Sequence, residues 1–338
     1  MQSFTKTALV LGAGGFIGHN MVSRLVKEGY YVRAISLEEP KFERSAANHF
    51  IIADLRDPAV LNKYIEIDNK PFQEVYHFAA DMGGAGYLFT EKHDADIMRN
   101  STLISLNLLD AQNKVNYKHN KFFTKVFYAS SACVYPKRNQ MDVNNPDCRE
   151  NTVYPADPDS EYGWEKLYTE RLFLAYKKNH NMNVRIARYH NIYGPNGTYD
   201  GGKEKVPAAI CRKIVKLPDT NKIEVWGDGK QTRSFLYIDD CIEATRRLVI
   251  SDYTDPINIG SEELVSINTL VDIVAHIANK KVIKIHKAGP VGVTGRNSNN
   301  ELIKNILDWT PRYTLKEGLT HTYKWIEEQI KNEPILAN

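Results

Sequence analysis

The sequence predicts an α/β protein built on a doubly wound parallel sheet, with a smaller, interleaved C-terminal lobe. Three observations carry this prediction. Short apolar runs alternate with helical segments through the first half of the chain, a glycine-rich turn follows the first apolar run directly, and the pattern changes after about residue 194. Strands separated by helical crossovers are typical of a parallel sheet with helices on both faces.

Strands and helices of the first half follow from composition and periodicity. Gly29 closes the first helix, as glycine commonly does just past a helix end. Runs rich in Val, Ile, Phe and Tyr predict buried strands at Thr7–Gly12, Tyr30–Ile35, Phe50–Ala53, Glu74–Ala80 and Lys125–Ser130. Helices are expected at Phe16–Glu28, at Asp94–Gln112 and from Tyr162 to about Lys178. In this Rossmann-type arrangement, ligands bind beyond the C-terminal ends of the strands.

The second half has a different sequence pattern, in which loops rich in Gly, Asn and Pro alternate with short strands and helices. We therefore assign residues 1–194 mainly to a dinucleotide-binding domain. Residues 195–338 mainly form a substrate-binding lobe, with some segments returning to the main domain.

Composition narrows the function classes. The chain has 338 residues, of which 42% are hydrophobic and 25% charged, with a net charge of +3. No stripe of Lys and Arg supports nucleic-acid binding, and no apolar run is long enough for a membrane helix. The beginning of the chain does not resemble a signal peptide. The four cysteines are widely spaced, which favours reduced thiols in a cytoplasmic protein over a disulfide framework or a metal site.

The glycine-rich turn Gly12-Ala-Gly-Gly15-Phe-Ile-Gly18 stands between a strand and a helix. Glycines let the backbone approach a pyrophosphate, and the N–H groups at the helix start favour negative charge, so the turn predicts a dinucleotide site. An acidic residue normally holds the adenosine ribose at the end of the second strand. Here only Glu38 and Glu39 follow, and Arg33 precedes them as a possible NADP contact or a solvated residue, so NAD is favoured over NADP. Asp54 is either a contact to the adenine edge or a turn cap.

Tyr162 and Lys166 lie four residues apart in a predicted helix, and so share one face. A nearby cation favours phenolate and lowers the tyrosine pKa, which would make Tyr162 a general base for a sugar hydroxyl. Such a spacing is common on ordinary helix surfaces. The phosphate turn before it, and Ser130-Ser131 at the end of an intervening strand, favour the catalytic interpretation.

These features resemble the extended short-chain dehydrogenase/reductase family, whose members act on nucleotide sugars with tightly held NAD. The resemblance narrows to the nucleotide-sugar epimerase branch and covers nearly the whole chain. Its more discriminating segments are Met82-Gly-Gly84, Ser131-Ala-Cys133 and Gly201-Gly-Lys-Glu-Lys205. Segments more widely shared are Tyr128–Pro136, His190–Pro195, Trp226–Phe235 and Gly295–Ser298.

The resemblance implies epimerisation of GDP-mannose at C3 and C5 to GDP-L-galactose, and to GDP-L-gulose when only C5 is inverted, through a 4-keto sugar. It implies Cys133 as base and Lys205 as acid, and a homodimer formed through two helices. The implied catalytic residues are Tyr162, Lys166, Cys133, Lys205 and Ser131. The implied cofactor-binding residues are Gly12, Gly15, Phe16, Ile17, Gly18, Asp54, Ala79, Tyr162 and Lys166. The implied substrate-binding residues are Gly83, Ser131, Ala132, Cys133, Asn191, Glu204, Lys205, Lys213, Gln231, Arg233 and Arg296.

Several alternatives stay open on the sequence alone. Cys133 could be a small buried hydrophobe, Lys205 a surface charge and Arg233 a structural ion-pair partner. A nucleotide-sugar 4-epimerase or 4,6-dehydratase of the same fold is the nearest rival. Dehydratases usually carry an acid near Ala132 or Cys133, and none stands there. A non-catalytic NAD-binding regulator is less favoured, because it would be expected to have lost Tyr162 or Lys166.

Overall fold

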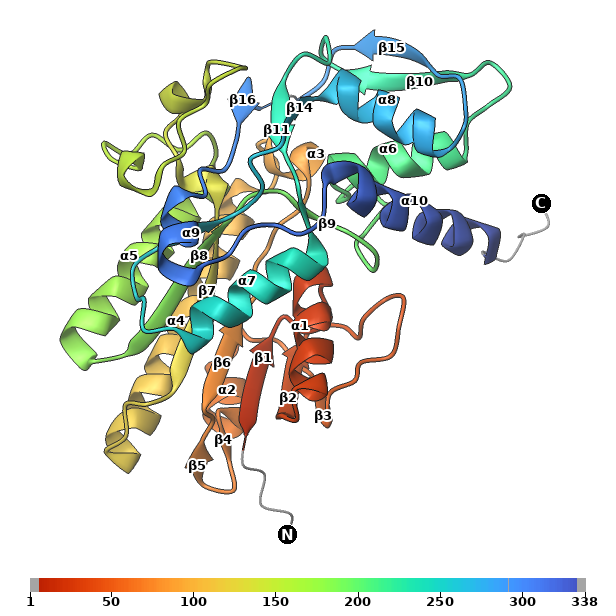
Figure 1. The fold of residues 1–338 in the computed structure, drawn as a ribbon. Helices are drawn as coiled ribbons and strands as arrows, with labels where there is room; N and C mark the ends of the chain where they lie inside the picture. The colour runs from red at the N-terminus through yellow and green to blue at the C-terminus, as the bar shows by residue number, and fades with distance from the viewer. Residues whose placement is uncertain (1–5, 291, 333–338) are drawn as a thin grey trace.

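A seven-stranded parallel sheet forms the centre of the protein (Figure 1). The computed structural model describes residues 6–290 and 292–332. The strand order is β13-β8-β7-β6-β1-β2-β3, and each neighbouring pair runs parallel. The order reverses at β1, which places a topological switch point beside the glycine-rich turn. The strands are β1 (Thr7–Leu11), β2 (Tyr31–Ser36), β3 (His49–Ile52), β6 (Glu74–His77), β7 (Lys125–Ser131), β8 (Asn183–Tyr189) and β13 (Ile257–Ile259).

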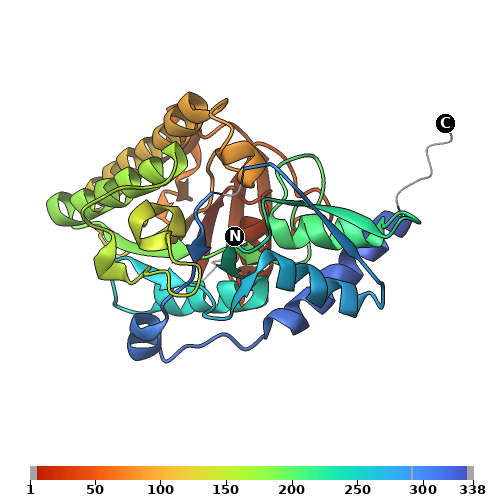
Figure 2. The same ribbon diagram turned by 90° about the horizontal axis from the view of Figure 1, so that it is seen from above.

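Helices cover both faces of this sheet, as the view from above shows (Figure 2). Because successive side chains of a strand point to opposite faces, β1 contributes to two cores. Ala8 and Val10 belong to the core with α1 and α7, whereas Leu9 and Leu11 belong to the core with α4 and α5. The flanking helices are α1 (Phe16–Lys27), α2 (Pro58–Tyr64), α4 (Asp94–His119), α5 (Glu161–His180) and α7 (Ile238–Ile250).

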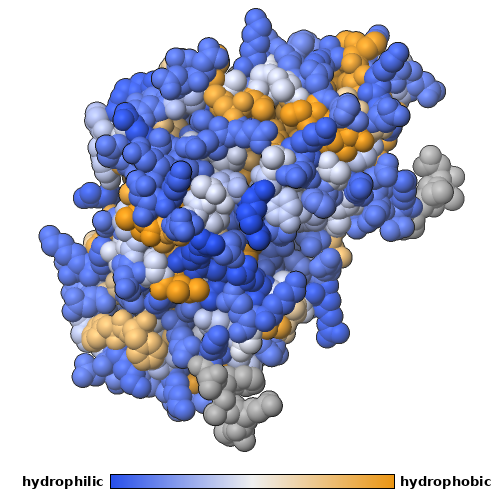
Figure 3. All heavy atoms as spheres, in the orientation of Figure 1, coloured by the Kyte–Doolittle hydropathy of each residue, from blue (hydrophilic) through white to orange (hydrophobic). Residues whose placement is uncertain are grey.

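The smaller lobe lies above the C-terminal ends of the main strands (Figure 1). In Figure 3 most of the visible face is hydrophilic, and the apolar side chains that show gather mainly over this lobe. Its helices are α6 (Val206–Val215), α8 (Ile267–Ile277) and α10 (Leu315–Asn332). Its strands form two small sheets. In the first, β10 (Lys222–Trp226) pairs with β15 (Ile283–Lys287). In the second, β11 (Thr232–Ser234) lies between β14 (Leu264–Ser266) and β16 (Gly295–Arg296).

Short elements complete the chain. They are β4 (Glu66–Ile67), β5 (Lys70–Pro71), α3 (Ala85–Leu88), β9 (Ile192–Tyr193), β12 (Leu236–Tyr237), α9 (Glu301–Leu307) and the 3-10 turns η1 (Ala132–Val134), η2 (Lys137–Gln140) and η3 (Glu150–Thr152). Within the described residues, no helix combines the length and the apolar character that crossing a bilayer requires.

The predicted α/β class and parallel sheet are confirmed, with shifts at the element ends. The strand expected to reach Ala80 ends at His77, after which the chain leaves the sheet toward the site. The helix expected to end at Gln112 continues to His119, because a break comes only where Asn120 adopts the left-handed conformation with φ of 47°. The division of the chain at residue 194 stays a prediction, and β13 from the second half pairs with β8 in the main sheet.

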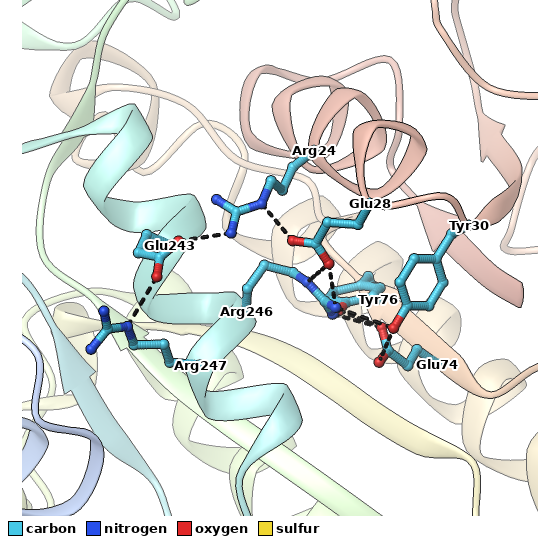
Figure 4. Close-up of polar contacts among 8 residues, drawn as sticks. All are labelled: Arg24, Glu28, Tyr30, Glu74, Tyr76, Glu243, Arg246 and Arg247. Atoms are coloured by element: carbon cyan, nitrogen blue, oxygen red, sulfur yellow. Dashed lines mark hydrogen bonds and ion pairs between the residues drawn. The ribbon is translucent and has the colours of Figure 1, made fainter. Parts of the chain in front are cut away.

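A buried charge cluster ties α7 to α1 and β6 (Figure 4). The Arg246 guanidinium donates to Glu28 at 3.0 and 2.7 Å and to Glu74 at 2.7 Å. It also contacts the hydroxyls of Tyr30 and Tyr76. Burying a guanidinium is costly unless carboxylates compensate its charge, and here two of them do. We call Arg246, Glu28, Glu74, Tyr30 and Tyr76 the Arg246 cluster.

Candidate active site

The first of two adjoining cavities lies at the C-terminal ends of β1, β2, β6 and β7. Its volume is about 550 Å³. All nine residues expected to bind the cofactor line it, namely Gly12, Gly15, Phe16, Ile17, Gly18, Asp54, Ala79, Tyr162 and Lys166. We call it the cofactor cavity.

The glycine-rich turn forms one wall of this cavity and leaves no room for side chains. Gly12 has φ of +77°, and a Cβ there would stand 2.6 Å from the backbone nitrogen of Ala79. A Cβ on Gly18 would stand 2.2 Å from the carbonyl oxygen of Gly12. Gly15 caps the start of α1, whose first N–H groups therefore face the turn. This cradle fits the pyrophosphate of a dinucleotide.

The adenosine end of the cavity answers the question about Arg33, whereas Asp54 both lines the cavity and caps a turn, because its side chain accepts from the backbone N–H of Arg56 at 2.9 Å. Arg33 donates to the carbonyls of Tyr64 at 2.9 Å and Glu66 at 2.6 Å, and it does not line the cavity. Arg33 is therefore a structural residue rather than a contact for a ribose phosphate. Asp54 lines the cavity and pairs with Arg56 at 2.6 Å, while the N-cap of α2 is Asp57 instead.

Tyr162 and Lys166 lie on the same face of α5, at the inner end of the cofactor cavity. The Lys166 Nζ atom is 5.5 Å from the centroid of the Tyr162 ring. The expected lowering of the Tyr162 pKa is not seen. Burial raises the pKa of Tyr162, the charges of Cys133 and Glu165 add to this rise, and a hydrogen bond with Ser131 opposes it. A phenolate at this position therefore needs a further positive charge beside it.

The second cavity, of about 440 Å³, lies between the main sheet and the smaller lobe. Ser131 and Tyr162 line both cavities, so the two cavities meet at these residues. All eleven residues expected to bind the substrate line the second cavity, namely Gly83, Ser131, Ala132, Cys133, Asn191, Glu204, Lys205, Lys213, Gln231, Arg233 and Arg296. We call it the substrate cavity.

Cys133 is held at the wall of the substrate cavity by its backbone and by a guanidinium. Its backbone N–H donates to the Ser131 hydroxyl at 3.2 Å, at the start of η1. Arg296 Nη1 donates to the Cys133 sulfur at 3.1 Å. Hydrogen bonds from a cation favour the thiolate. The other three cysteines are buried as expected, and burial raises the pKa of Cys148 and of Cys241 to about 12 each.

Lys205 directly precedes α6 and lines both cavities. Burial lowers the pKa of Lys205, whereas the charge of Cys133 raises it. The lowered pKa makes the ammonium a better proton donor near neutral pH. Lys205 is therefore not a solvated surface charge, and its ammonium and the Cys133 sulfur belong to one electrostatic environment.

Three further polar residues of the substrate cavity donate to backbone carbonyls, whereas Glu204 pairs with the Arg212 side chain at 2.9 Å. Lys213 Nζ donates to the Glu224 carbonyl at 2.8 Å, and Gln231 donates to the Trp226 carbonyl at 3.0 Å. Arg233 donates to the carbonyls of Thr232 and Val293, both at 2.7 Å. Burial and the neighbouring Arg296 lower the pKa of Arg233 to about 10. A buried cation destabilised in this way favours an anionic ligand.

Sequence reasoning missed several residues of the site. Asp159 lines the substrate cavity and pairs with Arg296 at 2.9 Å, and the buried Gln140 accepts from the Nε atom of Arg296 at 2.5 Å. Trp226, at the end of β10, also lines this cavity. Asp159 stands in a loop and Gln140 ends the short 3-10 turn η2, and neither segment has a periodicity that marks a site. Trp226 was visible in a recognised motif, but nothing in the motif indicated a cavity wall.

Comparisons with known proteins agree with this architecture. The family model described as "NAD dependent epimerase/dehydratase family" matches residues 8–260. The chain is 44% identical to GDP-mannose 3,5-epimerase of Arabidopsis thaliana over 96% of this chain and 83% of that protein. It is similar to the structure of UDP-glucose 4-epimerase from Thermotoga maritima, with a TM-score of 0.83 at 22% identity, over 96% of this chain and 99% of the other. It is also similar to UDP-glucuronic acid 4-epimerase from Bacillus cereus in complex with UDP-glucuronic acid and NAD, with a TM-score of 0.79 at 25% identity over 96% and 99% of the chains.

The chain belongs to the NAD dependent epimerase/dehydratase family. The expected family and the choice of NAD are thereby confirmed, and the fit of the glycine cradle is consistent with both.

Proposed function

We propose that this protein inverts GDP-mannose at C3 and C5 to give GDP-L-galactose, with GDP-L-gulose arising when only C5 is inverted. The observation that carries the proposal is the second pair of acid–base groups. Cys133 and Lys205 line one cavity together with Tyr162, and a simple 4-epimerase needs only the tyrosine. The 44% identity to a protein named GDP-mannose 3,5-epimerase supports the same substrate.

The first step is oxidation at C4 of the sugar. When bound, NAD supplies a positively charged nicotinamide ring that takes a hydride from C4 and later returns it. Tyr162 removes the proton of the C4 hydroxyl, and a positive charge beside the buried phenol offsets the burial that raises its pKa. Lys166 shares the helix face of Tyr162 and adds a second cation at the inner end of the cofactor cavity.

The ketone at C4 acidifies the protons on both neighbouring carbons. Inversion of each carbon then needs a base on one face of the ring and an acid on the other. We assign the base to Cys133, since Arg296 donates to its sulfur, and the acid to Lys205, since burial lowers its pKa. Return of the hydride to C4 closes the cycle without net oxidation.

The substrate cavity has the polar groups that a sugar nucleotide requires. We assign the diphosphate to the cations Arg233 and Lys213, and the sugar to Gly83, Ser131 and Asn191, with Arg296 beside Cys133 at the sugar end of the cavity. A Cβ on Gly83 would stand 2.7 Å from the Tyr87 side chain, so a larger residue at this position would displace that ring.

The decisive experiment is incubation of the purified protein with GDP-mannose in heavy water, with no added cofactor and with NMR detection of deuterium. We expect deuterium at both C3 and C5 together with new L-sugar nucleotides. The matched control is Tyr162→Phe, which should show no exchange, because without the 4-ketone the ring protons are not acidic. Absence of exchange in the unaltered protein, with NAD occupancy verified, would contradict the proposal and favour a 4-epimerase or dehydratase.

We further propose a homodimer that pairs through α4 and α5. Two large aromatic side chains of α5, Trp164 and Tyr168, are exposed by 41% and 49%. They stand one helical turn apart, and so share one face of the helix. Light scattering should give twice the chain mass, and a monomeric mass at micromolar concentration would contradict this assignment.

We also propose a cytoplasmic location for the protein. The proposed base Cys133 must remain a free thiol, and the reducing cytoplasm keeps thiols reduced.

A further inference from the structure

The starting point is the number of fixed contacts that Arg296 makes. Its Nε atom donates to Gln140 at 2.5 Å, its Nη1 atom to the Cys133 sulfur at 3.1 Å and its Nη2 atom to Asp159 at 2.9 Å. Arg296 is 6% exposed and Gln140 is fully buried. A planar guanidinium anchored at two of its nitrogens has little freedom at the third. The direction in which Nη1 points is therefore set by Gln140 and Asp159.

Each anchor is itself fixed. The Gln140 amide nitrogen donates to the carbonyls of Tyr135 at 2.9 Å and Pro136 at 3.3 Å, so its oxygen is the atom that faces Arg296. The Asp159 side chain is 4% exposed, in the loop that leads into α5. The contacts of Arg296 are buried and come from three separate segments, which contain Cys133, Gln140 and Asp159. Compensating the charge of Arg296 would need the Asp159 carboxylate alone.

We propose that Gln140 and Asp159 are positioning residues that hold the Arg296 guanidinium within hydrogen-bond distance of the Cys133 sulfur, where its positive charge favours the thiolate over the thiol. The inference rests on the proposed function for the use that is made of the thiolate. Neither residue needs to touch the substrate for this role. Although burial disfavours its charge, Cys133 and Asp159 hold the pKa of Arg296 above its ordinary value, which agrees with a lasting charge at this position.

Other titratable or charged groups around Cys133 also interact with the sulfur, and their effects have to be separated from that of Arg296. They come from five further segments of the chain: Tyr162 on α5, Lys205 before α6, Arg233 on β11, Cys148 after η2, and Asp159 through Arg296. Gln140 is the informative position among the neighbours, because it carries no charge. A change at Gln140 removes its amide contacts to Tyr135 and Pro136 and releases the guanidinium, but it leaves the net charge around the sulfur unchanged.

The test is the rate at which iodoacetamide alkylates Cys133 in the NAD-bound protein as a function of pH, followed by mass spectrometry of the peptide that contains it. Alkylation requires the thiolate, so the midpoint of the profile reports the state of the sulfur. The midpoint of the unaltered protein is the reference for each variant. In Gln140→Met, which removes the acceptor without changing charge, we expect an upward shift of about one pH unit, or about tenfold less thiolate below the midpoint.

Asp159→Ala distinguishes two ways in which the Asp159 carboxylate could affect the sulfur, by its own negative charge or by anchoring Arg296. If the carboxylate acts only by its charge, its loss lowers the midpoint, because a negative charge near the sulfur has gone. If it anchors Arg296, the midpoint rises, and this is the result we expect. The matched control is Asp272→Ala, which removes a carboxylate that pairs with Lys284 at 2.6 Å and lines neither cavity; the midpoint should stay unchanged.

An unshifted midpoint in folded Gln140→Met, or a lowered one in Asp159→Ala, overturns the proposal for that residue. If Gln140→Met does not fold, Arg296→Lys takes its place, since it keeps the charge but cannot reach both anchors and the sulfur. An unshifted midpoint in Arg296→Lys then overturns the proposal. Turnover of GDP-mannose by the unaltered protein is measured separately. If the midpoint shifts in the variants but the unaltered protein does not turn over GDP-mannose, the positioning role is supported and the proposed substrate is wrong. If the unaltered protein turns over GDP-mannose but the midpoint does not shift, the proposed substrate is supported and the positioning role is wrong.

Discussion

Arg246 and Arg296 are both buried guanidinium groups, with exposures of 2% and 6%, but their surroundings differ in kind. Arg246 contacts two carboxylates and two phenols that lie away from both cavities. Arg296 contacts one carboxylate, one amide and one thiol, and it lines the substrate cavity.

The difference lies in which partner can change its charge. In the Arg246 cluster the negative charge is carried by carboxylates, which stay ionised near neutral pH. Burial and neighbouring Glu74 raise the pKa of Tyr30 and Tyr76, so the phenols remain neutral. At Arg296 one partner is a thiol, whose ordinary pKa lies near neutrality. The first region can only stabilise the fold, whereas the second can also take part in proton transfer.

The largest stability effect is expected at Arg246. Arg246→Met leaves the buried Glu74 without its cation and leaves Glu28 with Arg24 alone, and should lower the free energy of unfolding by about 3–5 kcal/mol. Urea denaturation followed by circular dichroism measures this loss. Arg149→Met is the control, because it breaks an exposed, solvent-screened pair with Asp147 and should change the free energy of unfolding far less. Equal losses in the two variants would refute the structural role given to the Arg246 cluster.

The largest catalytic effect is expected at the thiol that Arg296 contacts. Cys133→Ala should still permit hydride exchange at C4 but should slow inversion at C5 by about 10²–10⁴-fold, the usual contribution of a general base. Deuterium exchange measured separately at C4 and C5 distinguishes the two steps. Cys211→Ala, at a buried cysteine outside both cavities, is the control and should keep its exchange rates. Wild-type inversion in Cys133→Ala would remove the thiol from the mechanism.

A somewhat smaller effect is expected at the acid partner. In the unaltered protein the inversion rate should fall as the pH rises through the lowered pKa of Lys205, because the ammonium must be protonated to donate. Lys205→Arg keeps the positive charge but cannot release a proton near neutral pH. This variant should lose about 10²-fold in inversion and should no longer show that alkaline decrease. An unchanged pH–rate profile would exclude Lys205 as the acid.

The contrast between local and distant contacts explains how much of the molecule the sequence predicted. The glycine-rich turn and the Tyr162/Lys166 spacing are local patterns, because each depends on backbone geometry over a few residues. The parallel sheet followed from strand–helix alternation in the same way. Resemblance located Cys133, Lys205 and Arg296, which spacing alone would have left among ordinary residues.

Neither local pattern nor resemblance located the anchors of Arg296. Gln140 is 156 residues away from Arg296 in sequence, and Asp159 is 137 away, so their contacts exist only once the smaller lobe is closed over the main sheet. The Arg246 cluster was missed for the same reason, since Arg246 and Glu74 are 172 residues apart. Burial also explains the error at Tyr162, because helical spacing predicts a neighbouring cation but not the loss of solvent that raises the pKa.

The smallest expected effect is a change in how the stability of the Arg246 cluster depends on pH in the acidic range. Although burial raises it, hydrogen bonds from Arg246 and Arg24 hold the pKa of Glu28 below its ordinary value of 4.5. A carboxylate of lowered pKa stabilises the fold fully above its unfolded value, and this stability is lost as the pH falls through the folded value. The free energy of unfolding should therefore decline below pH 4.5, and less steeply in Arg246→Met. Urea denaturation from about pH 6 to about pH 3 measures both slopes. Since Glu66 and Asp54 contribute to both proteins alike, parallel slopes would mean that Arg246 does not set the ionisation of Glu28.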